Sequence, residues 1–303
     1  MGDTAGTVSG RHSGPSSGPA RDWAVWKRVD GLGRPPLDLL HASLVHRQYA
    51  PHMHEEFAIG ACTGGQEVIW YRGERHYAGP GTVVVVEPGE PHTGAPAAPG
   101  GFIYRVLYPP ARLLAEPLGE LLREPGERRP HFPDLVIHDS ELASELRAVH
   151  AVLGSAGDAL EGDSRLAELI GELVRRHAAP LGTASRSRRA GSVAPPVMSL
   201  LADQMAQPPT LAQIAAELGL SRFQLLRAFR EEVGMPPYAW LAQHRVTHAK
   251  GLLDRGERPA EVASLVGFAD QAHLTRWFRR VVGVTPGAYR NSVQDSVPKR
   301  RRC

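Results

Sequence analysis

Residues 210–238 read TLAQIAAELGLSRFQLLRAFREEVGMPPY, and residues 258–287 read RPAEVASLVGFADQAHLTRWFRRVVGVTPG. The second stretch repeats the first, at an offset of 48 residues before an inner turn and 49 after it. An internal repeat of this kind indicates one structural unit used twice. Ten positions match: Ile214, Ala215, Gly219, Leu220, Leu225, Arg227, Phe229, Arg230, Gly234 and Pro237 pair with Val262, Ala263, Gly267, Phe268, Leu274, Arg276, Phe278, Arg279, Gly283 and Pro286.

Each copy predicts two short helices joined by a tight turn. In the first copy, Leu211, Ile214 and Leu218 form the apolar stripe of one helix. Gly219 ends that helix, because glycine accepts the left-handed conformation that a tight helix end needs. Ser221 then caps the next helix. The inward residues of the capped helices are four positions apart in both copies: Leu225 with Phe229, and Leu274 with Phe278.

This pattern is typical of a helix-turn-helix unit, whose second helix lies in the DNA major groove. Asp270 is the expected cap in the second copy. A long helix over 238–253 joins the units and presents their recognition helices to successive groove faces, roughly 34 Å apart. Arg227 and Arg276 suit either a guanine or a phosphate, and His273 is equally well explained as surface. The predicted DNA contacts are Arg222, Phe223, Leu226, Arg227, Arg230, Gln271, Ala272, His273, Thr275, Arg276 and Arg279.

The charge distribution points to a polyanionic partner for the same part of the chain. Residues 197–303 carry 15 Lys and Arg against 9 Asp and Glu, whereas residues 1–196 carry 20 against 23. A basic module joined to a mildly acidic one is typical of a nucleic-acid-binding domain attached to a domain with another task. The run at 299–302 either adds nonspecific phosphate attraction or is a solvated tail.

Composition narrows the class of protein. The 303 residues are 42% hydrophobic and 22% charged, as in a globular protein of two domains. We expect no membrane segment and no signal peptide. Cys62 and Cys303 stand in no disulfide or metal-ligand spacing, which fits a reducing, cytoplasmic setting. We find no catalytic signature, so no enzyme is predicted and no catalytic residue is assigned.

The chain divides into six segments, and the predicted fold class is α+β with two domains. Residues 1–20 predict a disordered tail, and residues 21–110 predict a small β-barrel of the jelly-roll kind. Residues 111–179 predict two amphipathic helices whose leucines either form a dimer contact or pack on the barrel. A linker (180–196), an all-helical DNA-binding domain (197–290) and a basic tail (291–303) follow. The expected strands are 57–63, 67–71, 75–78, 82–87 and 102–108.

The helical half carries long, specific motifs. They include Gly219-Leu220-Ser221, Arg245-x-x-x-Ala249-x-x-Leu252-Leu253, Asp270-Gln271-x-His273-Leu274-x-Arg276-x-Phe278 and Gly283-Val284-Thr285-Pro286-x-x-Tyr289-Arg290. With these, the run from 211 to 290 resembles the AraC/XylS family of bacterial transcription regulators. The resemblance implies a seven-helix DNA-binding domain with the contacts named above. Leu226 and Ala272 stand where many members have polar residues, so we expect apolar contact there, for example with a thymine methyl.

The sheet-rich half carries two further boxes, Pro51-His52-Met53-His54-Glu55-Glu56-Phe57 and Glu87-Pro88-Gly89-Glu90-Pro91-His92. They are similar to the two boxes of cupin barrels, although the second is one residue short. The resemblance implies a cupin-like sensor that binds a small organic effector at the barrel mouth, without metal or other cofactor. The alternative is a divalent metal held by the three histidines with Glu56 or Glu87. The candidate ligand-binding residues are His52, His54, Glu56, Trp70, Glu87, His92 and Tyr104.

We therefore expect a sequence-specific transcription regulator. Its predicted partners are double-stranded promoter DNA, a small-molecule effector, RNA polymerase and a second copy of the chain as a homodimer. An effector acts only if it binds one arrangement of the two DNA-binding units better than another. Two alternatives stay open: a metal-dependent cupin enzyme fused to a DNA-binding module, and a nonspecific architectural DNA binder.

Overall fold

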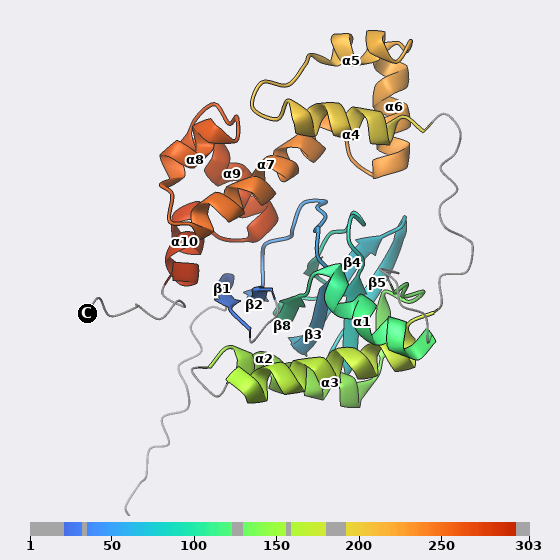
Figure 1. Ribbon diagram of the computed structural model, residues 1–303, viewed down its shortest axis with the longest axis vertical. Helices are drawn as coiled ribbons and strands as arrows, with labels where there is room; N and C mark the ends of the chain where they lie inside the picture. Colours follow the sequence, from blue (N-terminus) through green and yellow to red (C-terminus); the bar gives the residue numbers. More distant parts are fainter. Residues whose placement is uncertain (1–20, 32–34, 123–129, 156–158, 180–191, 295–303) are drawn as a thin grey trace, which may run out of the picture.

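The structure is a computed structural model that describes residues 21–31, 35–122, 130–155, 159–179 and 192–294. A sheet-rich half is followed by a helical half, which confirms the predicted α+β fold with two domains (Figure 1). The predicted tail at 1–20, most of the predicted linker and the basic run at 299–302 lie outside the described residues.

Within the described residues, the strands form two antiparallel sheets. The larger sheet has the order β1-β2-β8-β3-β6-β9, and the smaller has the order β5-β4-β7. The strands are β1 (Trp23–Val29), β2 (Leu37–Leu44), β3 (Ala58–Gly65), β4 (Glu67–Tyr71), β5 (Glu74–Ala78), β6 (Thr82–Val86), β7 (Ala95–Pro96), β8 (Phe102–Tyr108) and β9 (Val136–His138).

The predicted strands are present, but the larger sheet extends further along the chain. β1 and the start of β2 precede residue 39, where the predicted β-rich pattern begins, and β9 lies inside the segment predicted to be helical. β1 pairs with β2 from Trp23 opposite Ser43 onwards, and β9 pairs with β6 across a long stretch of chain. Both are edge strands, which a local pattern of residues identifies poorly because distant partners stabilise them.

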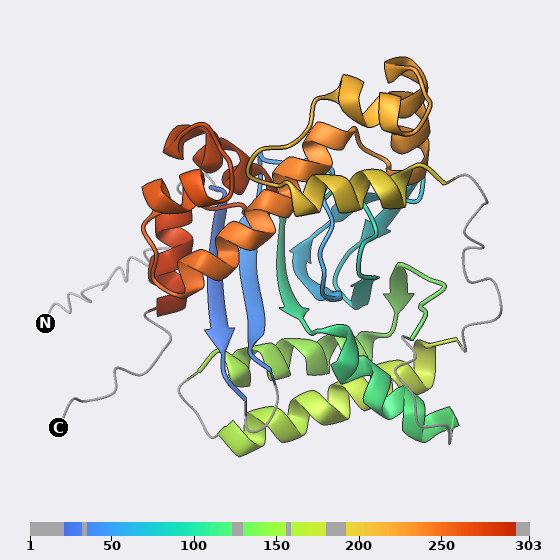
Figure 2. The same ribbon diagram turned by 45° about the horizontal axis from the view of Figure 1, so that its top comes forward.

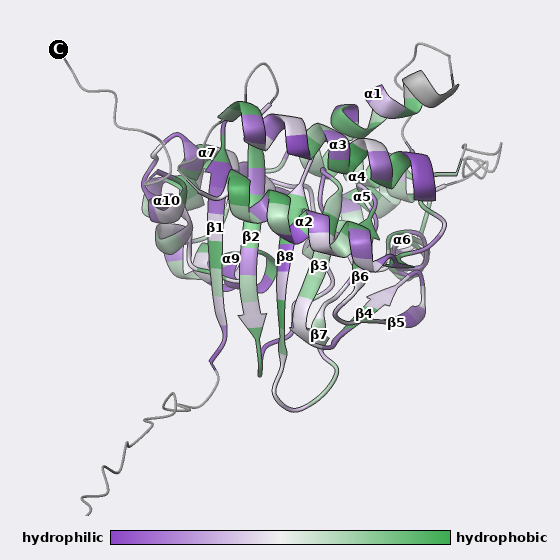
Figure 3. Cartoon of the chain, turned by 90° about the horizontal axis from the view of Figure 1, so that it is seen from below, coloured by the Kyte–Doolittle hydropathy of each residue, from purple (hydrophilic) through white to green (hydrophobic). Residues whose placement is uncertain are grey.

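The larger sheet is buried on both faces, because successive side chains of a strand point to opposite sides. Ile59, Val83 and Leu107 face a helical layer, whereas Val106 and Tyr108 belong to the core on the other side. Figure 3 shows the helices lying across the strands of this sheet. The layer consists of α1 (Ala111–Leu122), α2 (Ser140–Leu153) and α3 (Ala159–His177).

The leucine stripe of α2 and α3 packs on the chain's own sheet. Leu146, Val149 and Leu173 are at most 1% exposed and share one core with the strands. Of the two predicted roles for these leucines, the structure therefore shows packing on the barrel. A homodimer contact through the stripe is not available, since strands of the same chain already cover it.

The helical half contains seven helices within the described residues, as the predicted domain requires. α4 begins inside the predicted linker and α10 continues into the predicted tail, so the domain is a few residues longer at both ends. The helices are α4 (Ala194–Asp203), α5 (Leu211–Glu217), α6 (Arg222–Val233), α7 (Pro237–Asp254), α8 (Pro259–Leu265), α9 (Gln271–Val282) and α10 (Pro286–Gln294).

The two helix-turn-helix units form as the repeat predicts. The Ser221 hydroxyl accepts a hydrogen bond from Gln224 N, and Asp270 accepts one from His273 N, so both predicted caps are confirmed. Gly219 has a φ of +66° in the turn between α5 and α6. Leu225 and Phe229 are fully buried on the inward face of α6.

The two units are anchored differently. The first packs α4, α5, α6 and the start of α7 into a core of its own. The second, built from α8 and α9, shares a core with the sheet domain that includes Trp26, Tyr108, Phe278 and Tyr289. Figure 2 shows α7 running between the two units along one side of the sheet domain. In the described part of the chain, no helix is both long and apolar enough to cross a membrane.

Candidate ligand cavity and DNA-binding surface

A cavity of about 620 Å³, including its open mouth, lies between the two sheets. Its volume and its mixture of apolar and polar groups are typical of a small-ligand site. Apolar side chains from several strands, such as Leu40, Ile69 and Val106, form much of the wall. The polar groups in the wall are His52, His54, His92, Glu67, Tyr49, Tyr104 and Tyr108.

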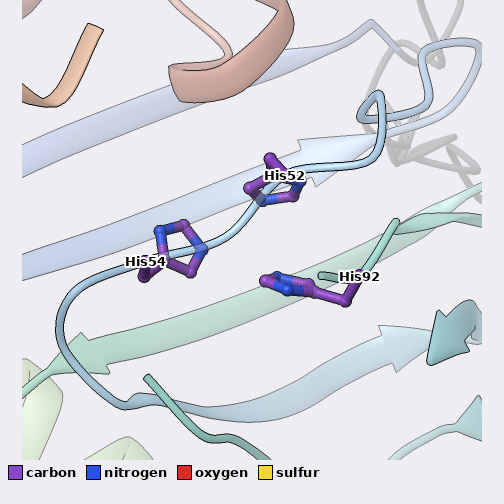
Figure 4. Close-up of side chains that lie close together, drawn as sticks. All are labelled: His52, His54 and His92. Atoms are coloured by element: carbon purple, nitrogen blue, oxygen red, sulfur yellow. The ribbon is translucent and has the colours of Figure 1, made fainter. Parts of the chain in front are cut away.

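Three histidines meet in this wall from two facing segments, as Figure 4 shows. His52 and His92 lie directly opposite one another, because each backbone N–H donates to the other's carbonyl, at 2.9 and 2.8 Å. His54 follows two positions after His52, and its carbonyl accepts a hydrogen bond from Gly89 N at 2.8 Å. One nitrogen from each of the three rings lies within 4.8 Å of the others.

The local hydrogen bonds set the tautomers of two rings. His52 Nδ1 lies 2.8 Å from the carbonyl of Ala50, and His92 Nδ1 lies 3.1 Å from the carbonyl of Glu90. A carbonyl only accepts, so in each ring Nδ1 carries the proton and Nε2 keeps its lone pair. Burial lowers the pKa of His52 to about 4 and that of His92 to about 3, and it lowers the pKa of His54 well below its usual value. All three rings are therefore neutral at neutral pH.

The opposite part of the cavity is acidic and phenolic. Burial raises the pKa of Glu67 to about 8, so its carboxyl is protonated at neutral pH and offers a hydrogen-bond donor. Tyr104 donates its hydroxyl to that of Tyr49 at 3.1 Å. Burial raises the pKa of Tyr49 to about 12. Two neutral hydrogen-bonding groups thus face the neutral imidazoles across an apolar space.

The predicted ligand-binding residues divide into two groups. His52, His54, His92 and Tyr104 line the cavity. The others do not line it: Glu56 borders a separate cleft near Lys250, and Trp70 is 46% exposed beside Arg75. Glu87 accepts a hydrogen bond from Phe132 N and lies 2.9 Å from His131 Nδ1. Neither Glu56 nor Glu87 belongs to the histidine cluster among the described residues.

Two elements of the DNA-binding domain reach the cavity and its wall. Val281, at the end of α9, lines the cavity itself. Gln243, on α7, accepts a hydrogen bond from Met53 N at 3.1 Å and donates one to the carbonyl of Pro51. The backbone on both sides of His52 is therefore tied to the helix that joins the two helix-turn-helix units.

A buried ion cluster fixes the same interface. Lys250 on α7 lies 3.1 Å from Asp38 on β2, and its ammonium also sits over the rings of Trp26 and Tyr289. Burial opposes the charge of Lys250, but the nearby Asp38 carboxylate more than compensates and keeps the pKa of Lys250 raised. Arg28 on β1 pairs with Asp254 at the end of α7. Opposite charges thus clamp the sheet domain to the carboxyl-terminal half of α7.

The predicted DNA contacts form the outer faces of α6 and α9. Arg222, Arg227 and Arg230 are exposed on α6, where Phe223 is 79% exposed. On α9, Gln271, Ala272, Arg276 and Arg279 are exposed, whereas His273 and Thr275 are partly buried. Leu226 is also partly buried. An exposed aromatic ring among arginines, on a helix whose other face is fully buried, suits a nucleic-acid surface.

Several residues of the site escaped the sequence analysis. Tyr108 lies on the same face of β8 as Tyr104, and Tyr49 lies three residues before His52, so both had a positional signal. Glu67, Gln243 and Val281 had none, because strand pairing and domain docking bring them to the cavity from distant parts of the chain.

A cavity-bearing sheet domain joined to paired helix-turn-helix units defines a ligand-responsive, DNA-binding regulator. The chain matches the family model of the AraC-like ligand binding domain over residues 34–170 and that of a helix-turn-helix domain over residues 214–292. It belongs to the AraC family of transcription regulators, which confirms the resemblance seen in its sequence.

Individual relatives agree with this assignment. The chain is 26% identical over 230 residues to the uncharacterized HTH-type transcriptional regulator YbfI of Bacillus subtilis, covering 76% of this chain and 82% of that protein. It is 25% identical over 257 residues to the arabinose operon regulatory protein of Escherichia coli, covering 77% and 80%. Apo ToxT from Vibrio cholerae has the same fold, with a TM-score of 0.54 and 12% identity over 85% of this chain and 97% of that chain.

Proposed function

We propose that this regulator changes its hold on promoter DNA when a small effector occupies the cavity between the sheets. The observation that carries the proposal is the double contact between cavity and DNA-binding domain. Val281 of α9 lines the cavity, and Gln243 of α7 holds the backbone around His52. An occupant that shifts either contact favours one arrangement of the recognition helices over another.

The DNA contacts in this proposal are the outward residues of α6 and α9. Arg227 and Arg276 occupy matching positions of the repeat, and both are exposed. Arginine pairs with guanine more often than any other side chain does in specific complexes, so we assign these two residues to base reading. The remaining arginines of the two helices are assigned to phosphates.

The wider setting rests on family membership. We propose that the protein acts in the cytoplasm, where bacterial promoters lie, as a homodimer that recruits RNA polymerase and catalyses no reaction. The dimer contact uses a surface other than the leucine stripe of α2 and α3, which is buried against the sheet. Light scattering at micromolar concentration tests the dimer, and a monomer mass contradicts it.

The main test begins with genome-wide mapping of bound sites in the cell of origin. A site recovered in this way is then titrated against purified full-length chain, with bulk genomic DNA as competitor. A sequence-specific regulator prefers its site by about a thousandfold or more. Equal affinity for both DNAs would replace the proposal with a nonspecific architectural role.

A further inference from the structure

We propose that His52, His54 and His92 form a binding site for one divalent transition-metal ion of the imidazole-preferring kind, such as Zn²⁺, Co²⁺ or Ni²⁺. The inference rests on the proposed sensor role of the cavity and names the chemistry of its occupant. Imidazole nitrogen is a preferred ligand of these ions.

The backbone holds the three rings in a fixed relation. His52 and His92 face each other across a doubly hydrogen-bonded bridge, and His54 is tied to Gly89 in the facing segment. The three ligand nitrogens lie within 4.8 Å of one another. A tetrahedral ion with Zn–N bonds of about 2.0 to 2.1 Å needs nitrogens roughly 3.4 Å apart. Rotation about side-chain torsions closes that difference while the backbone bridge stays intact.

The hydrogen bonds behind two of the rings match those of a metal site. Nδ1 of His52 donates to the carbonyl of Ala50, and Nδ1 of His92 donates to that of Glu90. A metal-binding histidine typically donates its second nitrogen in this way, which orients the ring and makes the ligand nitrogen more basic. The structure therefore supplies oriented Nε2 lone pairs together with the outer hydrogen bonds that a metal-binding imidazole needs.

The rest of the cavity suits an ion with an open coordination position. Three protein ligands leave the fourth position of a tetrahedral ion for water or a small anion. Glu67 is the one acidic side chain among the residues that line the cavity, and it provides charge compensation when a dication enters. An ion drawing the histidine segment inwards also moves Pro51 and Met53, the two residues whose backbone Gln243 holds.

The test uses the untagged, full-length chain after treatment with a chelator, titrated with Co²⁺ alone. We expect one equivalent to bind with the visible absorption of tetrahedral cobalt, and Zn²⁺ to displace it. The variants His54→Ala and His92→Gln should lose this absorption and bind about 100-fold or more weakly, since even outer-shell changes cost 10- to 100-fold. Far-ultraviolet circular dichroism and the urea midpoint establish that each variant is folded.

A second histidine pair provides the matched control. His244 and His248 are one turn apart on α7, with ring centroids 4.5 Å apart, and His248 is exposed. Such a pair is where adventitious cobalt would bind. The variant His248→Ala should keep the full signal. A signal lost in His248→Ala but retained in His92→Gln would overturn the proposal, as would the absence of stoichiometric binding by the folded wild-type chain.

The outcomes separate this inference from the proposed function. A chain that ignores Co²⁺ but still prefers its mapped DNA site removes the metal and leaves the regulator. A chain that binds one Co²⁺ yet prefers no DNA site keeps the metal and removes the sequence-specific role.

Discussion

Gln243 on α7 accepts a hydrogen bond from the backbone N–H of Met53 at 3.1 Å, and its side chain is almost fully buried between the two domains. The same amide donates to the carbonyl of Pro51. A side chain of the helix that joins the two helix-turn-helix units is therefore the partner of the backbone around His52. This contact is the shortest covalent and hydrogen-bonded route from the cavity wall to both recognition helices.

Replacing Gln243 tests that contact directly. Gln243→Leu leaves two buried backbone groups without partners, so we expect a loss of roughly 1 to 3 kcal/mol in the free energy of unfolding. Amide hydrogen exchange over residues 50–56 should become faster. Gln48→Leu, in an exposed part of the same loop, is the control and should leave exchange and stability unchanged. Equal exchange in both variants would show that α7 does not restrain the histidine segment.

The ion pair between Lys250 and Asp38 predicts strong coupling in a double-mutant cycle. Lys250→Met leaves a buried carboxylate without its counter-ion, and we expect a cost of roughly 3 to 5 kcal/mol. Asp38→Asn should be costly for the same reason, whereas the double variant should recover part of the loss. Urea unfolding of the full chain measures all four states. Additive losses would mean that the pair contributes nothing as a pair.

The titration of Glu67 predicts how stability depends on pH. The folded chain keeps this carboxyl protonated up to about pH 8, whereas the unfolded chain ionises it near its ordinary pKa of 4.5. Because the folded pKa is the higher one, the stabilisation is complete below the unfolded pKa and is lost as pH rises towards 8. Glu67→Gln mimics the neutral acid and should remove a fall of the order of 2 to 4 kcal/mol between about pH 5 and about pH 8. Parallel stability curves for variant and wild type would refute this.

Two phenylalanines of α6 predict opposite phenotypes. Phe229 is fully buried, so Phe229→Ala should reduce the free energy of unfolding by roughly 3 to 5 kcal/mol. Phe223 is exposed, so Phe223→Ala should change stability by no more than about 0.5 kcal/mol but weaken DNA binding. Fluorescence anisotropy on the mapped site, with urea unfolding alongside, measures both quantities. Unchanged DNA affinity in folded Phe223→Ala would remove this ring from the interface.

Arg276 tests the assignment of base reading. Arg276→Ala should cost about 1 to 3 kcal/mol on the mapped site and relax discrimination at one base pair. Arg258→Ala removes the same charge from an exposed position outside both recognition helices, and should weaken all DNA sequences alike. Gel-shift titrations on the mapped site and on single-base variants separate the two effects. Loss of affinity without loss of discrimination in Arg276→Ala would assign this arginine to phosphate.

The strands with alternating residues and the capped helices of the repeat were predictable, because their signals lie within a few residues of one another. Ser221, Asp270 and Gly219 act on the adjacent turn, so local sequence is enough to place them. β1 and β9 were not predictable in the same way, because each is an edge strand stabilised by a distant partner. The helical pair had two possible uses for its leucines, and only the packed structure shows which one is realised.

By itself, the sequence determined the duplicated helix-turn-helix units, the outward faces of their second helices and the two histidine boxes. Each of these depends on periodicity or spacing along a short stretch of chain. Only the tertiary structure decided that Glu67, Tyr49 and Val281 share one cavity with the histidines, and that Glu56 and Glu87 lie elsewhere. The physical reason is that strand register and domain docking bring together residues far apart in sequence, through contacts that no single segment encodes.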